Sequence, residues 1–226
     1  MDISTTKLGV IIVAGGVGNR MGAGVPKQFL LLGGKTILEI TLQRFLGRAS
    51  EIVVVLSSDQ HERWAEICEK SGLCGTHKVC SGGATRFESV RCGLAALGEC
   101  NLIAVHDGVR PLVSEEMIER GVAVATQTGT AIPIVEAVDS FRVLSESGFE
   151  VIDRSRLRAV QTPQIFRAEL LREAYKIDPS PRFTDDATVV EEVLKVPLCY
   201  YDGERKNLKI TTQDDLKIAE TFIAKE

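Results

Sequence analysis

Apolar runs and helix-like segments alternate along the chain up to residue 138, and this order constrains the fold more than any other feature. The apolar runs are rich in Val and Ile and nearly continuous, which is typical of strands covered on both faces. They occupy residues 7–14, 51–57, 101–107 and 130–138, with a shorter run at 77–83. Segments with helical spacing lie between them, at residues 36–46, 59–72, 85–97 and 114–129. The β-α-β-α order predicts a Rossmann-like, three-layer α/β domain with a mostly parallel sheet, spanning residues 1–226.

The predicted sheet brings its strand-to-helix loops together. Right-handed crossovers place these loops at one edge, and ligands of such sheets bind at the carboxyl ends of the strands. The loops that meet there are residues 14–27, 81–86 and 106–111. Any binding site is therefore expected among these three segments.

Several residues mark expected helix ends. Asp59 is expected to cap one helix, and Gly72 to stop it. Thr85 is expected as a cap with Glu88 as its capping-box partner, and Ser114 opens a helix with acidic residues in its first turn.

The pattern changes after residue 138. Residues 139–157 alternate apolar and polar side chains on either side of Ser145-Glu-Ser-Gly148, which predicts a hairpin. Its polar alternation suits an arm outside the core, at about residues 139–154. Helices are expected near residues 168–176, 185–195 and 212–224.

Composition excludes several classes of protein. The net charge of −4 argues against a nucleic-acid-binding protein, and no apolar stretch approaches the roughly 20 residues of a membrane span. The first apolar run is short for a signal peptide and has a single Lys7 before it. The six cysteines lack C-x-x-C spacing, as expected of reduced thiols in a cytoplasmic protein.

A glycine-rich loop follows the first predicted strand, in the sequence Ile11–Phe29, IIVAGGVGNRMGAGVPKQF. A dinucleotide fingerprint fits poorly, because its third glycine falls one place late and no acidic residue ends the second strand. The Gly-Gly-Lys-Thr at 33–36 lacks the earlier glycine of a P-loop and predicts a tight turn before a helix. A bound nucleoside triphosphate fits better, because glycines admit phosphate oxygens and Arg20 and Lys27 supply cations. A glycine turn with solvated cations stays open as an alternative.

The same loop is similar to the signature of nucleotidyltransferases that join a sugar or polyol phosphate to a nucleotide. Further stretches, SGGATRFESV, HDGVRP, Asp153-Arg154, QTPQ, FTDDAT and NLKIT, follow in an order that resembles the 2-C-methyl-D-erythritol 4-phosphate cytidylyltransferase family of the non-mevalonate isoprenoid pathway. Many members have Pro-Ala-Ala-Gly where this chain has Val13-Ala-Gly-Gly16, and Ala-Ala where it has Gly108-Val109. The small residues that approach the nucleotide are kept.

The resemblance implies transfer of a cytidylyl group from CTP to a polyol phosphate with release of pyrophosphate. Arg20, Lys27 and, by resemblance, Lys209 are the expected catalytic cations. The expected nucleotide-binding residues are Ala14, Gly15, Gly16, Gly82, Gly83, Arg86, Ser89 and Asp107. Gly82 and Gly83 are expected to leave backbone groups free for the edge of the cytosine ring.

Asp107 ends an apolar strand at the expected ligand edge. A carboxylate there can hold Mg²⁺, directly or through water, or bond a ribose hydroxyl. The neighbouring His106 is expected to be structural, because the attacking phosphate needs no base. Arg110 is expected to pair with an acidic neighbour.

The polyol phosphate is expected, by resemblance, to contact Arg154, Thr162, Thr184 and Lys209, together with Asp107. The family also implies a homodimer clasped through the arm, with Arg154 serving either its own or the partner's site. A ribitol-5-phosphate cytidylyltransferase is the closest alternative, and a catalytically silent nucleotide-binding protein is a remote one.

Overall fold

The computed structural model describes residues 6–15 and 25–224, and its centre is an eight-stranded sheet. The order is β10-β7-β11-β6-β1-β4-β5, with β12 also paired to β7. The strands are β1 (Leu8–Val13), β4 (Glu51–Leu56), β5 (Lys78–Ser81), β6 (Leu102–Asp107), β7 (Thr130–Glu136), β10 (Arg158–Val160), β11 (Gln164–Arg167) and β12 (Tyr200–Asp202). Strand β10 pairs antiparallel with β7, and β11 pairs antiparallel with both β6 and β7, whereas the other pairings of this sheet are parallel. The predicted mostly parallel sheet is confirmed.

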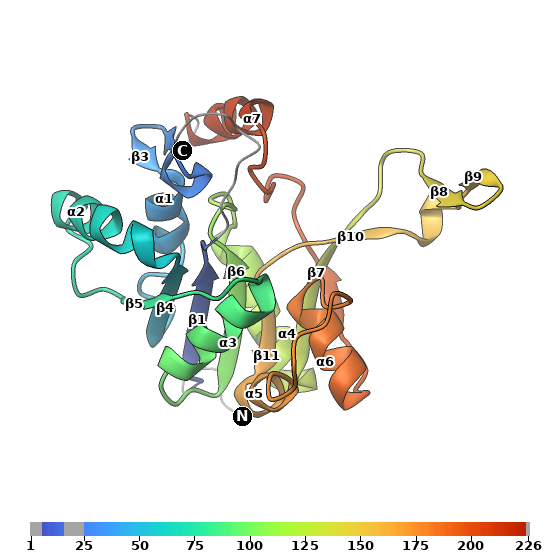
Figure 1. The fold of residues 1–226 in the computed structure, drawn as a ribbon, viewed down its shortest axis with the longest axis horizontal. Coiled ribbons are helices and arrows are strands. Elements are labelled where there is room, and N and C mark those ends of the chain that lie inside the picture. The colour runs from blue at the N-terminus through green and yellow to red at the C-terminus, as the bar shows by residue number, and fades with distance from the viewer. Residues whose placement is uncertain (1–5, 16–24, 225–226) are drawn as a thin grey trace.

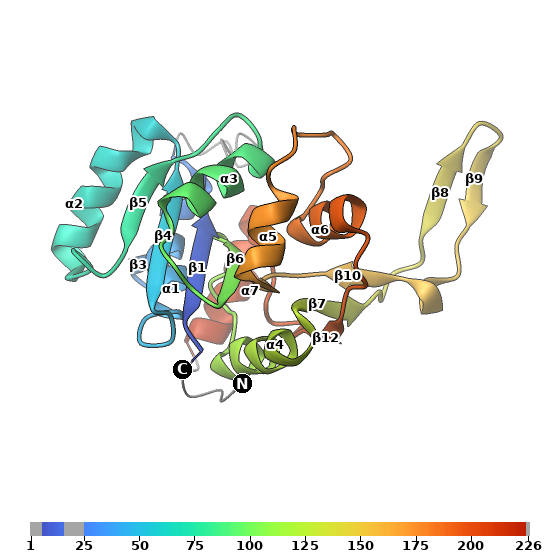
Figure 2. The same cartoon turned by 90° about the horizontal axis from the view of Figure 1, so that it is seen from below.

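Helices cover both faces of this sheet, as Figures 1 and 2 show. They are α1 (Ile37–Gln43), α2 (His61–Ser71), α3 (Arg86–Ala96), α4 (Glu115–Thr128), α5 (Ala168–Ala174), α6 (Asp186–Leu194) and α7 (Gln213–Ile223). The predicted helices are therefore all present. Within the described ranges, no helix is both long and apolar enough to cross a membrane.

The apolar strands feed two separate cores. In β1, Leu8, Val10 and Ile12 pack with residues of α1, α2 and α4 on one face. Ile11 points to the other face and packs with residues of α3, α5 and α6. Because successive side chains of a strand alternate between faces, a strand buried on both sides reads as a continuous apolar run.

A third, smaller cluster joins the start, middle and end of the chain. Leu32, Ile37, Val109, Ile210 and Ala219 are its central members, and they are all buried. The cluster lies beneath the hairpin of β2 (Leu31–Leu32) and β3 (Lys35–Thr36), against which α7 packs. The cluster therefore connects the parts of the chain that lie next to Lys27, Asp107 and Lys209 in the sequence.

The predicted turn at residues 33–36 is confirmed. Gly33 and Gly34 have φ angles of 60° and 85°, in the left-handed region that glycine adopts readily. Thr36 then caps α1, with Glu39 completing a capping box. The Gly-Gly-Lys-Thr sequence is a turn between two short strands and a helix, not a phosphate loop.

Most of the predicted helix ends are also confirmed. Thr85 and Glu88 form the expected capping box, and Gly72 ends α2 with a φ of 69°. The prediction for Asp59 is wrong, because Gln60 occupies the cap position of α2. Asp59 lies in a preceding 3₁₀ turn, where its carboxylate accepts hydrogen bonds from the side chains of Ser57 and Gln60.

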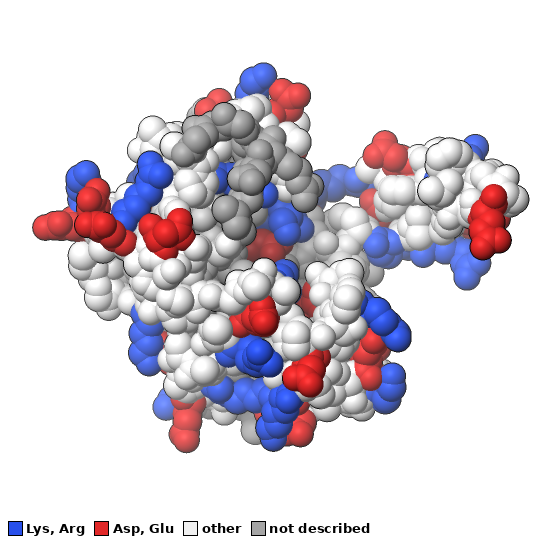
Figure 3. Space-filling model, viewed as in Figure 1, with Lys and Arg blue, Asp and Glu red and all other residues white. Residues whose placement is uncertain are grey.

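The arm contains the predicted hairpin, made of β8 (Arg142–Ser145) and β9 (Gly148–Val151). It projects from the body beyond β7 and β10 (Figure 2). Basic side chains gather along one side of this projection in the space-filling view (Figure 3). Leu144 and Phe149 face each other across the strands and are 72% and 74% exposed. An isolated two-stranded hairpin with exposed apolar side chains is marginally stable in water.

Candidate active site

A cavity of about 250 Å³ opens at the carboxyl edge of β1, β5 and β6. Most of the predicted site residues that the structure describes line it. They are Ala14, Gly15, Lys27, Gly83, Arg86, Ser89, Asp107 and Lys209. The sheet therefore brings the three predicted loops to one place, together with the segment before α7.

Other predicted residues lie elsewhere. Gly16 and Arg20 fall outside the described residues. Arg154 and Thr184 do not line the cavity. Thr162 is 4% exposed and sits behind Asp107 in the interior. Arg154 instead donates from Nη1 to the backbone oxygen of Val138 at 2.7 Å, at the base of the arm.

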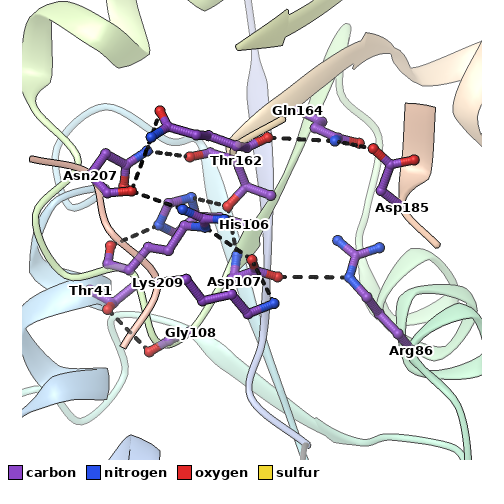
Figure 4. Close-up of polar contacts among 12 residues, drawn as sticks. Thr41, Arg86, His106, Asp107, Gly108, Thr162, Gln164, Asp185, Asn207 and Lys209 are labelled. Carbon is purple, nitrogen blue, oxygen red and sulfur yellow. Dashed lines mark hydrogen bonds and ion pairs between the residues drawn. The ribbon is translucent and has the colours of Figure 1, made fainter. Parts of the chain in front are cut away.

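Asp107 is the acidic centre of the site, and in the described part of the chain three cations surround its carboxylate. Lys209 Nζ and Arg110 Nε each lie 3.1 Å from Oδ2, and Arg86 Nε lies 3.7 Å from Oδ1. In Figure 4, Lys209 and Arg86 reach Asp107 from opposite sides. Burial favours the neutral acid, but the charges of Arg86, Lys209 and Arg110 outweigh it and hold the pKa of Asp107 well below its usual range. The carboxylate is ionised, and the expected pairing of Arg110 with an acidic neighbour is confirmed.

Arg86 is fixed by a second, fully buried carboxylate. Its Nη2 donates to Asp186 Oδ2 at 2.7 Å, and Tyr175 donates from its hydroxyl to Asp186 Oδ1 at 2.6 Å. Phe87 stacks on Tyr175 with ring centroids 4.6 Å apart. Asp186 of α6 thus holds one edge of the Arg86 guanidinium, and the Nε of Arg86 is directed toward Asp107.

His106 is buried and neutral, and its surroundings fix its tautomer. Burial lowers its pKa to about 4. Nε2 lies 3.0 Å from the backbone oxygen of Arg110, which can only accept, so Nε2 carries the proton. Nδ1 then accepts from the hydroxyl of Thr162 at 3.0 Å. Both ring nitrogens are engaged within the protein, as the structural role expected for His106 requires.

The loop after β5 differs in one respect from the prediction. The backbone N–H of Gly82 is not free, because it donates to the backbone oxygen of Leu56 at 2.7 Å and prolongs the pairing of β4 with β5. Gly83 lines the cavity, and a Cβ there would lie 2.3 Å from the Cβ of Glu88 in α3. Packing against the first turn of α3 therefore requires a glycine at position 83.

Gly15 has a different environment. A Cβ there would meet its nearest described neighbours, Ser89 Oγ and the Ser57 nitrogen, only at ordinary contact distances of 3.7 and 3.8 Å. Packing among the described residues does not demand a glycine at this position, which lines the cavity. Close approach of a ligand is one reason for a glycine at such a point.

Lys27 begins a 3₁₀ turn, Lys27–Phe29, whose first two residues line the cavity. The next residue, Gln28, is buried and donates from Nε2 to the backbone oxygen of Ala14 at 2.8 Å. This bond ties the turn to the end of β1, so Lys27 lines the same cavity as Gly15. Sequence reasoning did not single out Gln28, although it directly follows the lysine.

The described lining of the cavity carries three cations, Lys27, Arg86 and Lys209, and one acid, Asp107. A concave site with an excess of positive charge concentrates anions such as phosphates. Across residues 6–15 and 25–224, no group of three or more His, Cys, Asp or Glu side chains is arranged to hold a metal ion. A metal would therefore rely on Asp107 together with the oxygens of a ligand.

Two buried residues near the site had no role from sequence reasoning. Asp186 lies in FTDDAT and Asn207 in NLKIT, and both are fully buried. From sequence alone, an Asp at a helix start looks like a capping residue, and an Asn beside a charged loop looks like a turn residue. Only the tertiary contacts identify them as partners of site residues.

The chain is similar to known proteins over nearly its whole length. The family model of 2-C-methyl-D-erythritol 4-phosphate cytidylyltransferase matches residues 8–225. The protein of that name from Bacteroides fragilis is 45% identical over 215 residues, covering 94% of this chain and 98% of its own length. The one from Porphyromonas gingivalis is 46% identical over 213 residues, covering 94% of this chain and 96% of its own length.

Solved structures share the fold over nearly the whole chain. A 4-diphosphocytidyl-2C-methyl-D-erythritol synthase of Anaerococcus prevotii has a TM-score of 0.82 at 27% identity, with 98% of both chains covered. A 2-C-methyl-D-erythritol 4-phosphate cytidylyltransferase of Thermus thermophilus has a TM-score of 0.76 at 32% identity, covering 96% of this chain and 99% of its own. From its sequence match and its fold together, this chain belongs to the 2-C-methyl-D-erythritol 4-phosphate cytidylyltransferase family.

Proposed function

We propose that this protein transfers the cytidylyl group of CTP to 2-C-methyl-D-erythritol 4-phosphate, giving 4-diphosphocytidyl-2-C-methyl-D-erythritol and pyrophosphate. The observation that carries the proposal is the convergence of Lys27, Arg86 and Lys209 on one cavity beside Asp107. Family membership supports the choice of the two substrates. One domain, residues 1–226 with the arm as an appendage, would carry the activity.

The reaction requires positioning and charge stabilisation. Its nucleophile is a phosphate oxygen of the polyol phosphate, a monoester that carries about −1.5 to −2 charges at neutral pH. This oxygen attacks the α-phosphorus in line, while the bond from that phosphorus to the departing pyrophosphate breaks. Lys27 and Lys209, with Arg20 by family resemblance, would neutralise charge that develops on the α-phosphate and the leaving group. The scheme contains no general base, in keeping with a neutral His106 whose ring nitrogens are both engaged.

The nucleotide would enter over the end of β1. Gly15 and Gly83 line the cavity there, with Ala14 and Ser89 beside them. The roles of Gly16 and Gly82 in nucleotide binding come from the family resemblance. Arg86, held by Asp186, would face the nucleotide with a fixed guanidinium.

We infer that Mg²⁺ accompanies CTP. Asp107 fits this role in part: its Oδ2 is already paired with Lys209 and Arg110, whereas Oδ1 has, among the described ion pairs, the longer contact with Arg86. Oδ1 would therefore be the oxygen that holds the ion, directly or through water, with phosphate oxygens as the other ligands. A bound Mg²⁺ supplies neutralisation of phosphate charge.

The arm is proposed to form a homodimer contact and to carry Arg154 to the site of the partner. Exposed apolar side chains on β8 and β9 support a contact with another surface. Arg154 does not line the cavity of its own chain, which supports service in the other. Thr184 and Thr162 are the further polyol-binding residues that the resemblance suggests.

We propose that the protein works in the cytoplasm. All six cysteines are free thiols, which suits a reducing compartment. No nucleic-acid or membrane partner is proposed for it.

Substrate choice distinguishes this proposal from a ribitol-5-phosphate cytidylyltransferase. We expect kcat/KM for 2-C-methyl-D-erythritol 4-phosphate to exceed that for ribitol 5-phosphate by about 10²-fold or more, because polyol contacts must discriminate a branched from a linear chain. Pyrophosphate release from CTP–Mg²⁺ with each alcohol phosphate measures this ratio. Equal kcat/KM values for the two alcohol phosphates would give the ribitol-5-phosphate alternative equal standing. Release with neither substrate would favour a catalytically silent nucleotide-binding protein.

A further inference from the structure

Lys209 poses a positioning problem. Its ammonium lies 3.1 Å from Asp107 Oδ2, yet its side chain is 43% exposed. A lysine has a long flexible stem that costs rotamer entropy to fix, and a partly exposed ion pair contributes little to holding it. The placement of Lys209 at the site must therefore come from the backbone that carries it.

Asn207, two residues earlier, anchors that backbone on one side through a closed ring of hydrogen bonds. Asn207 is 0% exposed, and its Nδ2 donates to the backbone oxygen of Thr162 at 2.8 Å. The Thr162 hydroxyl accepts from the backbone nitrogen of Asp107 at 3.0 Å. Asp107 Oδ2 accepts from Arg110 Nε at 3.1 Å, and Arg110 Nη1 donates to the backbone oxygen of Asn207 at 2.8 Å.

The ring links three separate parts of the chain. It joins the end of β6, the segment before β11 and the segment before α7, and Figure 4 shows Asn207 beside Thr162 with Asp107 on the far side. His106 supports it from within by bonding both the hydroxyl of Thr162 and the backbone of Arg110. Asn207 Oδ1 has no hydrogen-bond partner among the described residues, so the carboxamide acts through its Nδ2 donor.

Ile210 anchors the same backbone on the other side of Lys209. It is fully buried in the small cluster with Val109 and Leu112. Its backbone nitrogen also donates to the backbone oxygen of Val109 at 2.9 Å. Lys209 is thus held between a polar and an apolar anchor, and both of them attach to the segment that carries Asp107.

We propose that Asn207 and Ile210 are positioning residues that hold Lys209 against Asp107 and so set this cation for the reacting phosphates. This role rests on the proposed function, and neither residue contacts the cavity itself. The ring supports a site role because its hydrogen bonds converge on Asp107, the acid that Lys209 pairs with. A purely structural Asn207 would stabilise the fold without acting through Lys209.

A double-mutant cycle separates the two roles. Asn207→Ala is expected to lower kcat by about 10- to 100-fold, because small displacements of a catalytic group have large effects on rate. In a Lys209→Ala background the same change is expected to alter kcat by only about twofold, since the residue it positions is already gone. Affinity for CTP–Mg²⁺, measured by calorimetry, should stay within about threefold of wild type, because the glycine loop and Arg86 are untouched.

Two further variants complete the test. Ile210→Val removes one methylene and keeps the backbone hydrogen bond, so this variant should fold even if Asn207→Ala does not. It should also lower kcat, and this loss should vanish in the Lys209→Ala background. Thr130→Val is the matched control: this buried threonine accepts a backbone N–H from Cys199, and it lies at the start of β7 and not in the cavity. It should lower the melting temperature and leave kcat unchanged.

The outcomes separate the inference from the function on which it rests. Turnover of the two proposed substrates by the wild-type protein is measured first, and its absence would contradict the proposed function. With turnover present, kcat losses that persist undiminished in the Lys209→Ala background would overturn the positioning role. An unchanged kcat in both Asn207→Ala and Ile210→Val would overturn it as well.

Discussion

Replacement of Lys27 by alanine is expected to lower kcat by about 10²- to 10³-fold, or about 2.7–4 kcal/mol of transition-state stabilisation. The 3₁₀ turn and the bond from Gln28 to the end of β1 place this lysine at the cavity. There it would face charge that grows on the phosphates only as the reaction proceeds, so kcat should fall much more than KM for CTP rises. Steady-state kinetics with CTP as the varied substrate measure both quantities.

Lys35→Ala is the matched control for this variant. Lys35 lies in β3 and donates to the side chain of Gln43 at 3.0 Å, and it does not line the cavity. Its loss should change neither kinetic constant. A Lys27→Ala variant that altered only KM for CTP would show that the lysine binds the ground state, and would remove it from the catalytic group.

Mixing two inactive variants is expected to restore about a quarter of all active sites if the arm carries Arg154 into the partner. Lys27→Ala and Arg154→Ala chains are unfolded together, refolded and assayed. Half of the randomly paired dimers are mixed, and each mixed dimer has one doubly damaged site and one intact site. The expectation rests on the position of Arg154, which lies at the base of the arm and away from the cavity of its own chain.

Lys27→Ala mixed with Lys209→Ala is the negative control. Both lysines line the cavity of a single chain, so every site of such a mixed dimer lacks one of them and no activity should return. Recovery in the first mixture alone supports a shared site. If mixed dimers of the first pair form but turn over no substrate, Arg154 serves its own chain or has no role in substrate binding.

Much of the fold was predictable from local sequence, because local rules and tertiary packing agree in this chain. The run from Leu8 to Val13 reads as a strand buried on both faces, and its side chains do enter two different cores. Thr85 and Glu88 read as a capping box and form one. Asp59 shows where such rules fail: a 3₁₀ turn, Ser58–Gln60, precedes α2, so Gln60 and not Asp59 occupies the cap position.

The candidate site was predictable only in part, because sequence patterns report which residues reach an edge but not what they bond there. The position of Asp107 followed from its place at the end of an apolar strand. The three cations around it come from α3, from the turn after β6 and from the segment before α7, and only the fold shows that they meet. Gly82 illustrates the same limit, because strand pairing engages a backbone donor that its sequence context left open.

The stereochemical course at the α-phosphorus tests the central claim most directly. The account requires one in-line displacement by the phosphate of 2-C-methyl-D-erythritol 4-phosphate, without a covalent cytidylyl-enzyme intermediate. A single diastereomer of CTP with sulfur on the α-phosphate makes that phosphorus chiral, and the configuration of the product can be read by ³¹P NMR. The account predicts transfer with inversion of configuration. Retention of configuration would indicate two displacements through an enzyme nucleophile, and it would contradict the account. Binding of the analogue without any transfer to this alcohol would also contradict it.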